Sequence, residues 1–224
     1  AIKLLKEGNA AYVAGTPTHP RGDAGRRGEV AKGQKPFAII LGCADSRVPP
    51  EVIFDRGLGD LFVVRDAGNI AGDIEIGSIE YGAEHLGASL IVVLGHERCG
   101  AVTAAVKGGE VPGHIICIID KIQAAVDKTR GKAGDAVENA VKANVQEVRA
   151  KLLSAGPILT KLVEEKKLQV VGAYYDLDTG AVEFLDTSAP EPPKEGAPSV
   201  AAAAKEEPKP AEEKGSVGSK KYLF

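Results

Sequence analysis

The chain has 224 residues, of which 44% are hydrophobic and 26% are charged, and its formal net charge is -3. This composition fits one globular domain with a sizeable core plus an appendage, and the charge gives no basis for binding nucleic acid or a membrane surface. No apolar stretch approaches the roughly 20 residues that a membrane-spanning helix needs. Three cysteines argue against a disulfide scaffold.

The first fifteen residues predict a short helical arm. Apolar residues recur there at roughly helical spacing, at Ile2, Leu5, Ala10 and Val13, before prolines and glycines break the pattern. The chain opens at Ala1 and contains no methionine. An initiator methionine or a signal peptide could have preceded this residue. Our default expectation is a cytoplasmic protein, and a periplasmic one if a signal peptide was removed.

Three short apolar runs follow, at residues 37–41, 61–64 and 90–94, and each is typical of a buried strand. The first run is closed by Gly42 and followed at once by Cys43, and the third is followed by His96 after another glycine. Open α/β sheets place their sites at the carboxyl ends of parallel strands. We therefore expect these two side chains to emerge at one edge of the sheet.

Helical patterns separate and follow these strands. Apolar residues at 3-4-3 spacing predict a helix over 76–86 with Gly87 as its C-cap, and a second amphipathic helix is predicted over 137–152. Residues 169–174 and 182–185 then read as a hairpin. Strands that alternate with helices predict an α/β fold with a mostly parallel central sheet flanked by helices.

The composition changes near residue 188. From 189 to 224 the chain is rich in Pro, Glu, Lys and Ala, and such a segment cannot bury enough apolar surface to offset its chain entropy. The sequence therefore predicts a folded domain over residues 1–188 and a flexible tail over 189–224.

Cys43, His96 and Cys99 form a candidate metal site. Two thiolates and one imidazole suit a borderline-soft divalent ion, most naturally zinc, and leave a fourth coordination position for water or substrate. Because His96 and Cys99 are three residues apart, we expect one turn at the start of a helix to aim both at one ion. The spacing alone is also compatible with a structural zinc site or with three buried residues.

Asp45 and Arg47 follow the first cysteine by two and four residues. On their own they would be an ordinary ion pair. Their placement beside a metal ligand instead favours a catalytic role, in which both side chains control the fourth coordination position.

The patterns Cys-x-Asp-x-Arg at 43–47 and His-x-x-Cys at 96–99 resemble the signature of the β-class carbonic anhydrases. The resemblance covers residues 1–187, with further landmarks in order at 59–69, 79–81, 175–177 and 179–180. It implies one Zn²⁺ per subunit and the reversible hydration of CO2 to bicarbonate and a proton. It also implies an N-terminal helical arm that packs on a partner subunit.

The resemblance assigns roles around the metal. Asp45, held in place by Arg47, would orient a zinc-bound hydroxide towards CO2, so these two residues are the expected catalytic pair. Gln34 would hydrogen-bond the substrate, and the backbone N–H of Gly100 would contact bicarbonate.

The resemblance also implies that Phe62 and Tyr81 line an apolar CO2 pocket that is shared between subunits, so we expect a homodimer or a homotetramer. Tyr81 and His85 match a pair that would relay the proton.

One position separates the branches of this family. Where the branch regulated by bicarbonate has a tryptophan three residues before the first cysteine, this chain has Ile40, although Arg65 and Tyr175 match that branch. With Gln34 present, the sequence is closer to the plant-type branch. We therefore expect an open site, in which Asp45 is paired with Arg47.

Two other functions remain open at this level. The same scaffold serves hydrolysis of COS or CS2, although Gln34, Phe62 and Tyr81 favour CO2. A zinc-bearing thiol module for sensing, without catalysis, is the alternative from another class, and the presence of both Asp45 and Arg47 argues against it. The third cysteine, Cys117, is expected to be a small core residue.

Overall fold

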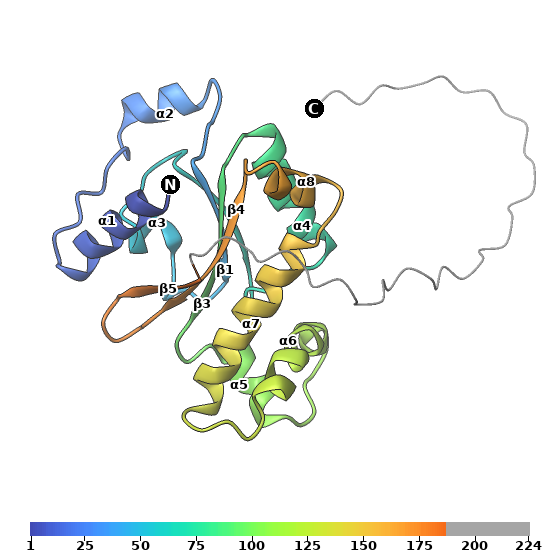
Figure 1. Ribbon diagram of the computed structural model, residues 1–224. Coiled ribbons are helices and arrows are strands. Elements are labelled where there is room, and N and C mark those ends of the chain that lie inside the picture. The colour runs from blue at the N-terminus through green and yellow to red at the C-terminus, as the bar shows by residue number, and fades with distance from the viewer. Residues whose placement is uncertain (187–224) are drawn as a thin grey trace, which may run out of the picture. The chain divides into compact units, whose positions relative to one another are not determined.

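The computed structural model describes residues 1–186, so the predicted tail at 189–224 lies outside the described residues. A five-stranded sheet with the order β2-β1-β3-β4-β5 forms the centre (Figure 1). Four strands are parallel, and the fifth runs antiparallel to its neighbour. Their bounds are Ala38–Cys43 (β1), Leu61–Asp66 (β2), Leu90–His96 (β3), Gln169–Tyr175 (β4) and Val182–Asp186 (β5). The predicted α/β fold with a mostly parallel sheet is confirmed.

Both faces of the sheet are covered, which explains why β1 and β3 are apolar along their whole length. Every residue of these two strands is buried. Because neighbouring residues of a strand point to opposite faces, Ile40 and Val92 belong to one hydrophobic core, whereas Ile39 and Ile91 belong to another. The sheet is therefore the middle layer of three.

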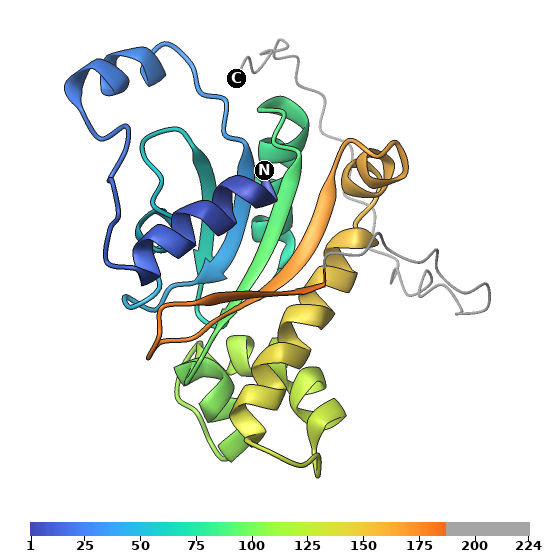
Figure 2. The same ribbon diagram turned by 60° about the vertical axis from the view of Figure 1, so that its left-hand side comes forward.

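Helices supply the outer layers. The core that contains Ile40 also takes residues from α1 (Ile2–Val13) and α3 (Pro50–Ile53), and Figure 2 shows α1 crossing this face of the sheet. The opposite core takes residues from α4 (Asp73–Glu80), α8 (Ile158–Glu164) and the second half of α7 (Ala136–Leu153). Of the described residues, no helix is both long and apolar enough to cross a membrane.

The N-terminal arm is helical as expected, and α1 contacts its own chain. Leu5 is fully buried, and the buried side chain of Asn9 donates hydrogen bonds to the backbone oxygens of Ile53 and Gly180. A second short helix, α2 (Ala24–Val30), which sequence reasoning missed, begins after the N-cap Asp23. Packing of the arm on a partner subunit stays a prediction.

The predicted helix before β3 is present in two parts. After α4 the chain continues through a π-helical turn, η1 (Tyr81–His85), and leaves the helix at Gly87, whose φ of +72° is the left-handed conformation of a C-cap glycine. The hairpin of β4 and β5 is also present.

Three helices gather at the end of the sheet where β1 and β3 finish. These are α5 (Gly100–Lys107), α6 (Ile115–Thr129) and the first turns of α7 (Figure 1). The expectation that Cys117 is a core residue is wrong, because this thiol is exposed on α6. Ile119 and Ile122 face the core instead. An unbroken apolar run at a helix start surrounds the helix, so only part of it can turn inward.

Candidate metal centre

Two of the three predicted metal ligands come from neighbouring strand ends, and the third comes from the start of a helix. Cys43 is the last residue of β1 and His96 is the last residue of β3, and these strands pair in parallel. Cys99 is the N-cap of α5. The spacing suggested that His96 and Cys99 lie on one helical turn, and this expectation is wrong. A tight strand-to-helix connection brings them together, and Arg98 within it has a φ of +50°.

The ligand atoms of these side chains converge in the interior. One ligand atom each from Cys43, His96 and Cys99 lie within 4.8 Å of one another. His96 is fully buried, and the two cysteines are no more than 4% exposed. Within residues 1–186 this is the one group of three such side chains close enough to hold a metal ion.

The surroundings of Cys43 favour a thiolate. Its Sγ accepts backbone N–H groups from Asp45 at 3.4 Å and from Gly68 at 3.3 Å. A hydrogen bond shared with the Cys99 thiol lowers the pKa of Cys43 well below its usual range, and the same bond raises the pKa of Cys99. The pair thus holds one negative charge readily, and a bound cation would favour the second thiolate as well.

The imidazole of His96 is oriented for metal binding. Its Nδ1 lies 2.8 Å from the backbone oxygen of Glu97, and this contact places the ring hydrogen on Nδ1 and leaves the lone pair on Nε2. Nε2 is buried and makes no hydrogen bond to any of residues 1–186. Two sulfurs and one imidazole nitrogen that faces inward without a partner fit a zinc ion with one open position.

Asp45 and Arg47 form a close ion pair beside these ligands. The Nε and Nη2 atoms of Arg47 donate to the two carboxylate oxygens of Asp45 at 2.9 and 2.7 Å, and the Arg47 guanidinium holds the pKa of this carboxyl well below its usual range. Oδ2 of Asp45 lies 3.9 Å from Nε2 of His96. The carboxylate therefore borders the space in front of the metal ligands.

Two residues that support the site from outside were not assigned a structural role by sequence reasoning. Arg65, at the end of β2, donates to the backbone oxygens of Cys43 at 2.8 Å and of Asp45 at 2.5 Å. Asn144, buried on α7, donates to the backbone oxygen of Gly68 at 2.9 Å. Their supporting roles could not be read from a motif, because each residue acts through the backbone of another segment.

The backbone conformation and the surroundings of residue 68 explain why it is a glycine. Gly68 has a φ of +82°, and a Cβ at this residue would lie 2.7 Å from Cδ1 of Ile122. The left-handed φ favours glycine, and a Cβ would also require the Ile122 side chain to shift. The N–H of Gly68 can then reach the Cys43 sulfur while its carbonyl accepts from Asn144.

Of the other predicted site residues, Phe62, Tyr81 and His85 lie together, whereas Gln34 and Gly100 lie elsewhere on the surface. The rings of Phe62 and Tyr81 are 6.2 Å apart, and those of Tyr81 and His85 are stacked at 5.2 Å, so these three form one aromatic row. Tyr81 is 46% exposed. Gln34 is exposed in the loop before β1, where its side chain makes no hydrogen bond to residues 1–186, and Gly100 is exposed at the start of α5.

Comparison with known proteins gives one consistent group. The family model described as carbonic anhydrase matches residues 38–182. "Carbonic anhydrase 2" of Mycobacterium tuberculosis is 42% identical over 190 residues, which cover 83% of this chain and 92% of that protein. The carbonic anhydrase of Mycolicibacterium smegmatis is 40% identical over 188 residues, with 82% and 91% covered.

Solved structures agree with this result. One of the tetrameric β-carbonic anhydrases from the filamentous ascomycete Sordaria macrospora superposes with a TM-score of 0.66 at 27% identity, over 79% of this chain and 90% of that one. A Coccomyxa β-carbonic anhydrase in complex with acetazolamide superposes with a TM-score of 0.64 at 27% identity, over 82% of this chain and 84% of that one.

Proposed function

The chain belongs to the β-carbonic anhydrase family and is a carbonate dehydratase, and we propose that Cys43, His96 and Cys99 hold its zinc while Asp45 and Arg47 act as its catalytic pair. The observation that carries this proposal is the convergence of the three ligand atoms within 4.8 Å, with the Asp45 carboxylate next to His96. One zinc ion per subunit is expected.

Zinc supplies the acidification of a bound water, which provides the nucleophile for CO2. Two thiolate ligands would neutralise the charge of a bound zinc ion, so it would acidify water less strongly than an ion held by three neutral imidazoles would. The remaining contribution has to come from side chains around the ligands.

Asp45 is the side chain placed to make this contribution. Its carboxylate stays ionised because Arg47 donates two hydrogen bonds to it, and in that state it can only accept hydrogen bonds. Asp45 therefore accepts the hydrogen of the nucleophilic oxygen and turns a lone pair of that oxygen towards the CO2 carbon. Arg47 fixes the position of the carboxylate and is itself held near the Arg98 carbonyl, 3.4 Å from Nη2.

Phe62 and Tyr81 are the proposed walls of an apolar CO2 pocket, and the partly exposed Tyr81 ring is available to a second subunit. Gln34 would hydrogen-bond the substrate from the loop before β1, and the Gly100 backbone N–H would contact bicarbonate. This arrangement requires at least a dimer. A related β-carbonic anhydrase is described as tetrameric, which supports self-association here.

His85 is the proposed proton relay together with Tyr81. Its ring is exposed and stacks on the Tyr81 ring. An exposed imidazole is able to pass protons to and from buffer molecules.

Stopped-flow measurement of CO2 hydration on the zinc-loaded protein tests the proposal. We expect one zinc per chain and a hydration rate far above that of buffer at alkaline pH. A protein that carries one zinc per chain but shows no rate above buffer would contradict the proposed function. Chelation should abolish the rate and added Zn²⁺ should restore it.

A further inference from the structure

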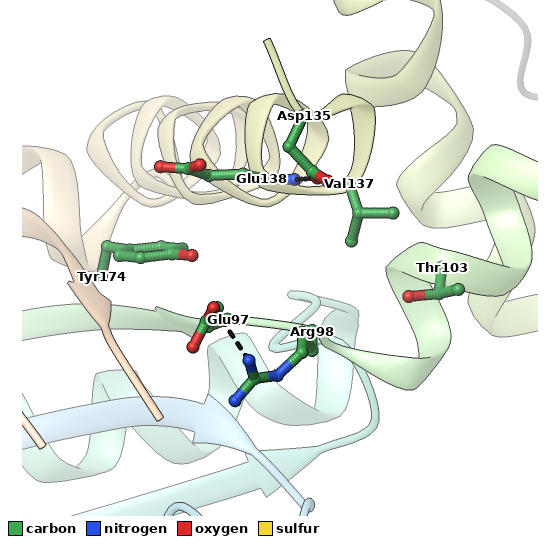
Figure 3. Close-up of a pocket in the computed structure, with 7 residues that line it drawn as sticks. All are labelled: Glu97, Arg98, Thr103, Asp135, Val137, Glu138 and Tyr174. Atoms are coloured by element: carbon green, nitrogen blue, oxygen red, sulfur yellow. Dashed lines mark hydrogen bonds and ion pairs between the residues drawn. The ribbon is translucent and has the colours of Figure 1, made fainter. Parts of the chain in front are cut away.

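A cavity lies outside the metal centre, beside the connection that joins His96 to Cys99, and Glu97 and Arg98 of that connection line it. Its volume is about 550 Å³, and Figure 3 shows it between the end of β3, the start of α7 and β4. None of the three metal ligands lines it. The volume is in the range of small-molecule sites.

The hydroxyl of Tyr174 has no partner in this cavity. Tyr174 is only 6% exposed, and its hydroxyl makes no hydrogen bond to any of residues 1–186. Figure 3 shows this hydroxyl pointing into the space between Glu97 and α7. The hydroxyl oxygen itself is open to the cavity, so a molecule bound there can hydrogen-bond to it.

The walls of the cavity carry an excess of negative charge. Glu97, Asp135 and Glu138 line it together with one cation, Arg98. Arg98 is shared between Glu97, at 3.2 Å, and Asp178, at 2.6 Å.

Lys142, the next cation, is likewise shared, between Glu138 at 2.9 Å and Glu183 at 3.5 Å. Asp178, Glu183 and Lys142 lie outside the lining, so the walls themselves carry three carboxylates and one cation, an excess of two negative charges. Burial, followed by the charges of Glu138 and Glu97, raises the pKa of Tyr174, so its hydroxyl stays neutral.

A single metal ion does not explain this arrangement. Within residues 1–186 the carboxylates of the cavity do not form a group of three close enough to hold an ion. Their charges are spread over the walls and match a longer cation that carries several N–H donors. The ring of Tyr174 already accepts one ammonium group on its face, since Nζ of Lys142 lies 4.8 Å from the ring centre.

We propose that this cavity binds a small organic cation with two ammonium groups, which donates hydrogen bonds to Glu138 and Asp135 and to the hydroxyl of Tyr174. Asp135 uses Oδ1 to cap α7 by accepting the backbone N–H of Glu138, and its other oxygen is available. The site does not depend on the metal ligands, so it is testable separately from catalysis.

Calorimetric titration of the zinc-loaded protein with 1,4-diaminobutane tests the proposal. We expect saturable binding of one equivalent per chain. Tyr174→Phe and Glu138→Gln should each weaken binding about tenfold, because each removes one hydrogen bond to a charged group. The control Glu110→Gln, an exposed carboxylate outside the cavity, should bind as the unaltered protein does.

A neutral diol of the same length separates charge recognition from cavity filling, and we expect no binding of 1,4-butanediol. Tyrosine-labelled protein adds a measurement without substitution: the Tyr174 ring signal should shift on titration while the Tyr12 signal stays in place. Three results would each overturn the proposal: no saturation, equal binding of the diol, or unchanged affinity in both variants with CO2 hydration intact.

Discussion

The carboxylate of Asp45 and the guanidinium of Arg47 meet through two parallel hydrogen bonds of 2.9 and 2.7 Å, two residues apart on one loop. A pair of this geometry fixes both the charge and the direction of the carboxylate. Because Asp45 lies beside the metal ligands without being one of the three, its contributions to turnover and to metal binding are separable.

Asp45→Ala should keep its zinc and lose about 10²-fold or more in CO2 hydration, because the nucleophilic oxygen is no longer oriented. Metal analysis and stopped-flow kinetics on the same sample check this. Glu51→Ala is the matched control, since Glu51 is an exposed carboxylate a few residues further along. Full activity of Asp45→Ala at every pH would show that the orientation mechanism is wrong.

Cys43→Ala should purify without stoichiometric zinc, because it leaves one thiolate and one imidazole for the ion. Cys117→Ala should retain one zinc per chain, since this third thiol is exposed on α6. Elemental analysis after dialysis compares the two variants. If both held zinc equally, Cys43 would not be a ligand.

Asn144→Ala should lower the free energy of unfolding by about 1–3 kcal/mol, because the Gly68 carbonyl loses its buried donor. Zinc affinity should fall about tenfold as well, since Gly68 positions its N–H on the Cys43 sulfur. Urea unfolding and competition with a chelator measure the two effects. Asn139→Ala, which removes a half-buried amide whose hydrogen bond to the Ala133 carbonyl is open to solvent, should leave zinc affinity unchanged and cost less stability than Asn144→Ala.

Asp66 gives a pH dependence of known sign. Burial raises its pKa from 3.8 to about 7, and its Oδ2 has no hydrogen-bond partner among the described residues. Between these two values the folded state binds more protons than the unfolded state, so the free energy of unfolding should fall as the pH rises, and should level off above about 7.

Asp66→Asn should remove this fall in the free energy of unfolding with rising pH. The variant should therefore gain stability relative to the unaltered protein as the pH rises. Urea unfolding across this pH interval measures it, with the exposed Asp120→Asn as control. A carbon NMR titration that places the Asp66 carboxyl near its ordinary pKa would refute the explanation.

Substitution of the exposed Ile74 tests whether the protein self-associates through α4. It is 81% exposed on α4, and Tyr81, which follows this helix, is 46% exposed. Ile74→Glu should reduce the mass measured by light scattering towards that of a monomer, because a charge would enter an apolar interface. Ile116→Glu, an exposed isoleucine on α6, should leave the mass unchanged. An unaltered mass for Ile74→Glu would place the interface elsewhere.

The sheet and the convergence of Cys43, His96 and Cys99 were predictable because their signals are local. Short branched runs closed by glycine identified β1 and β3, and the parallel arrangement brought Cys43 and His96 to one edge. Periodicity found α7, whose inward residues recur every three or four positions.

The remaining features depend on tertiary contacts. Cys117 was misplaced because the isoleucines around it surround the start of α6, and only the packing against α5 and α7 decides which of them turn inward. Asn144 and Arg65 were assigned no supporting role because each donates to backbone atoms far away in the sequence. The conformation of the Glu97–Cys99 connection follows from a positive φ at Arg98, which no spacing rule predicts.

The origin of the ligands at two separate strand ends has a consequence for folding. An ion held by Cys43 and Cys99 would close the stretch of chain between them into a ring, as a disulfide does, and would restrict the unfolded ensemble. The ring would contain β2, α4 and all of β3. Loss of the ion would therefore destabilise the whole domain as well as the reaction centre. The cross-link between the end of β1 and the start of α5 would be lost with it.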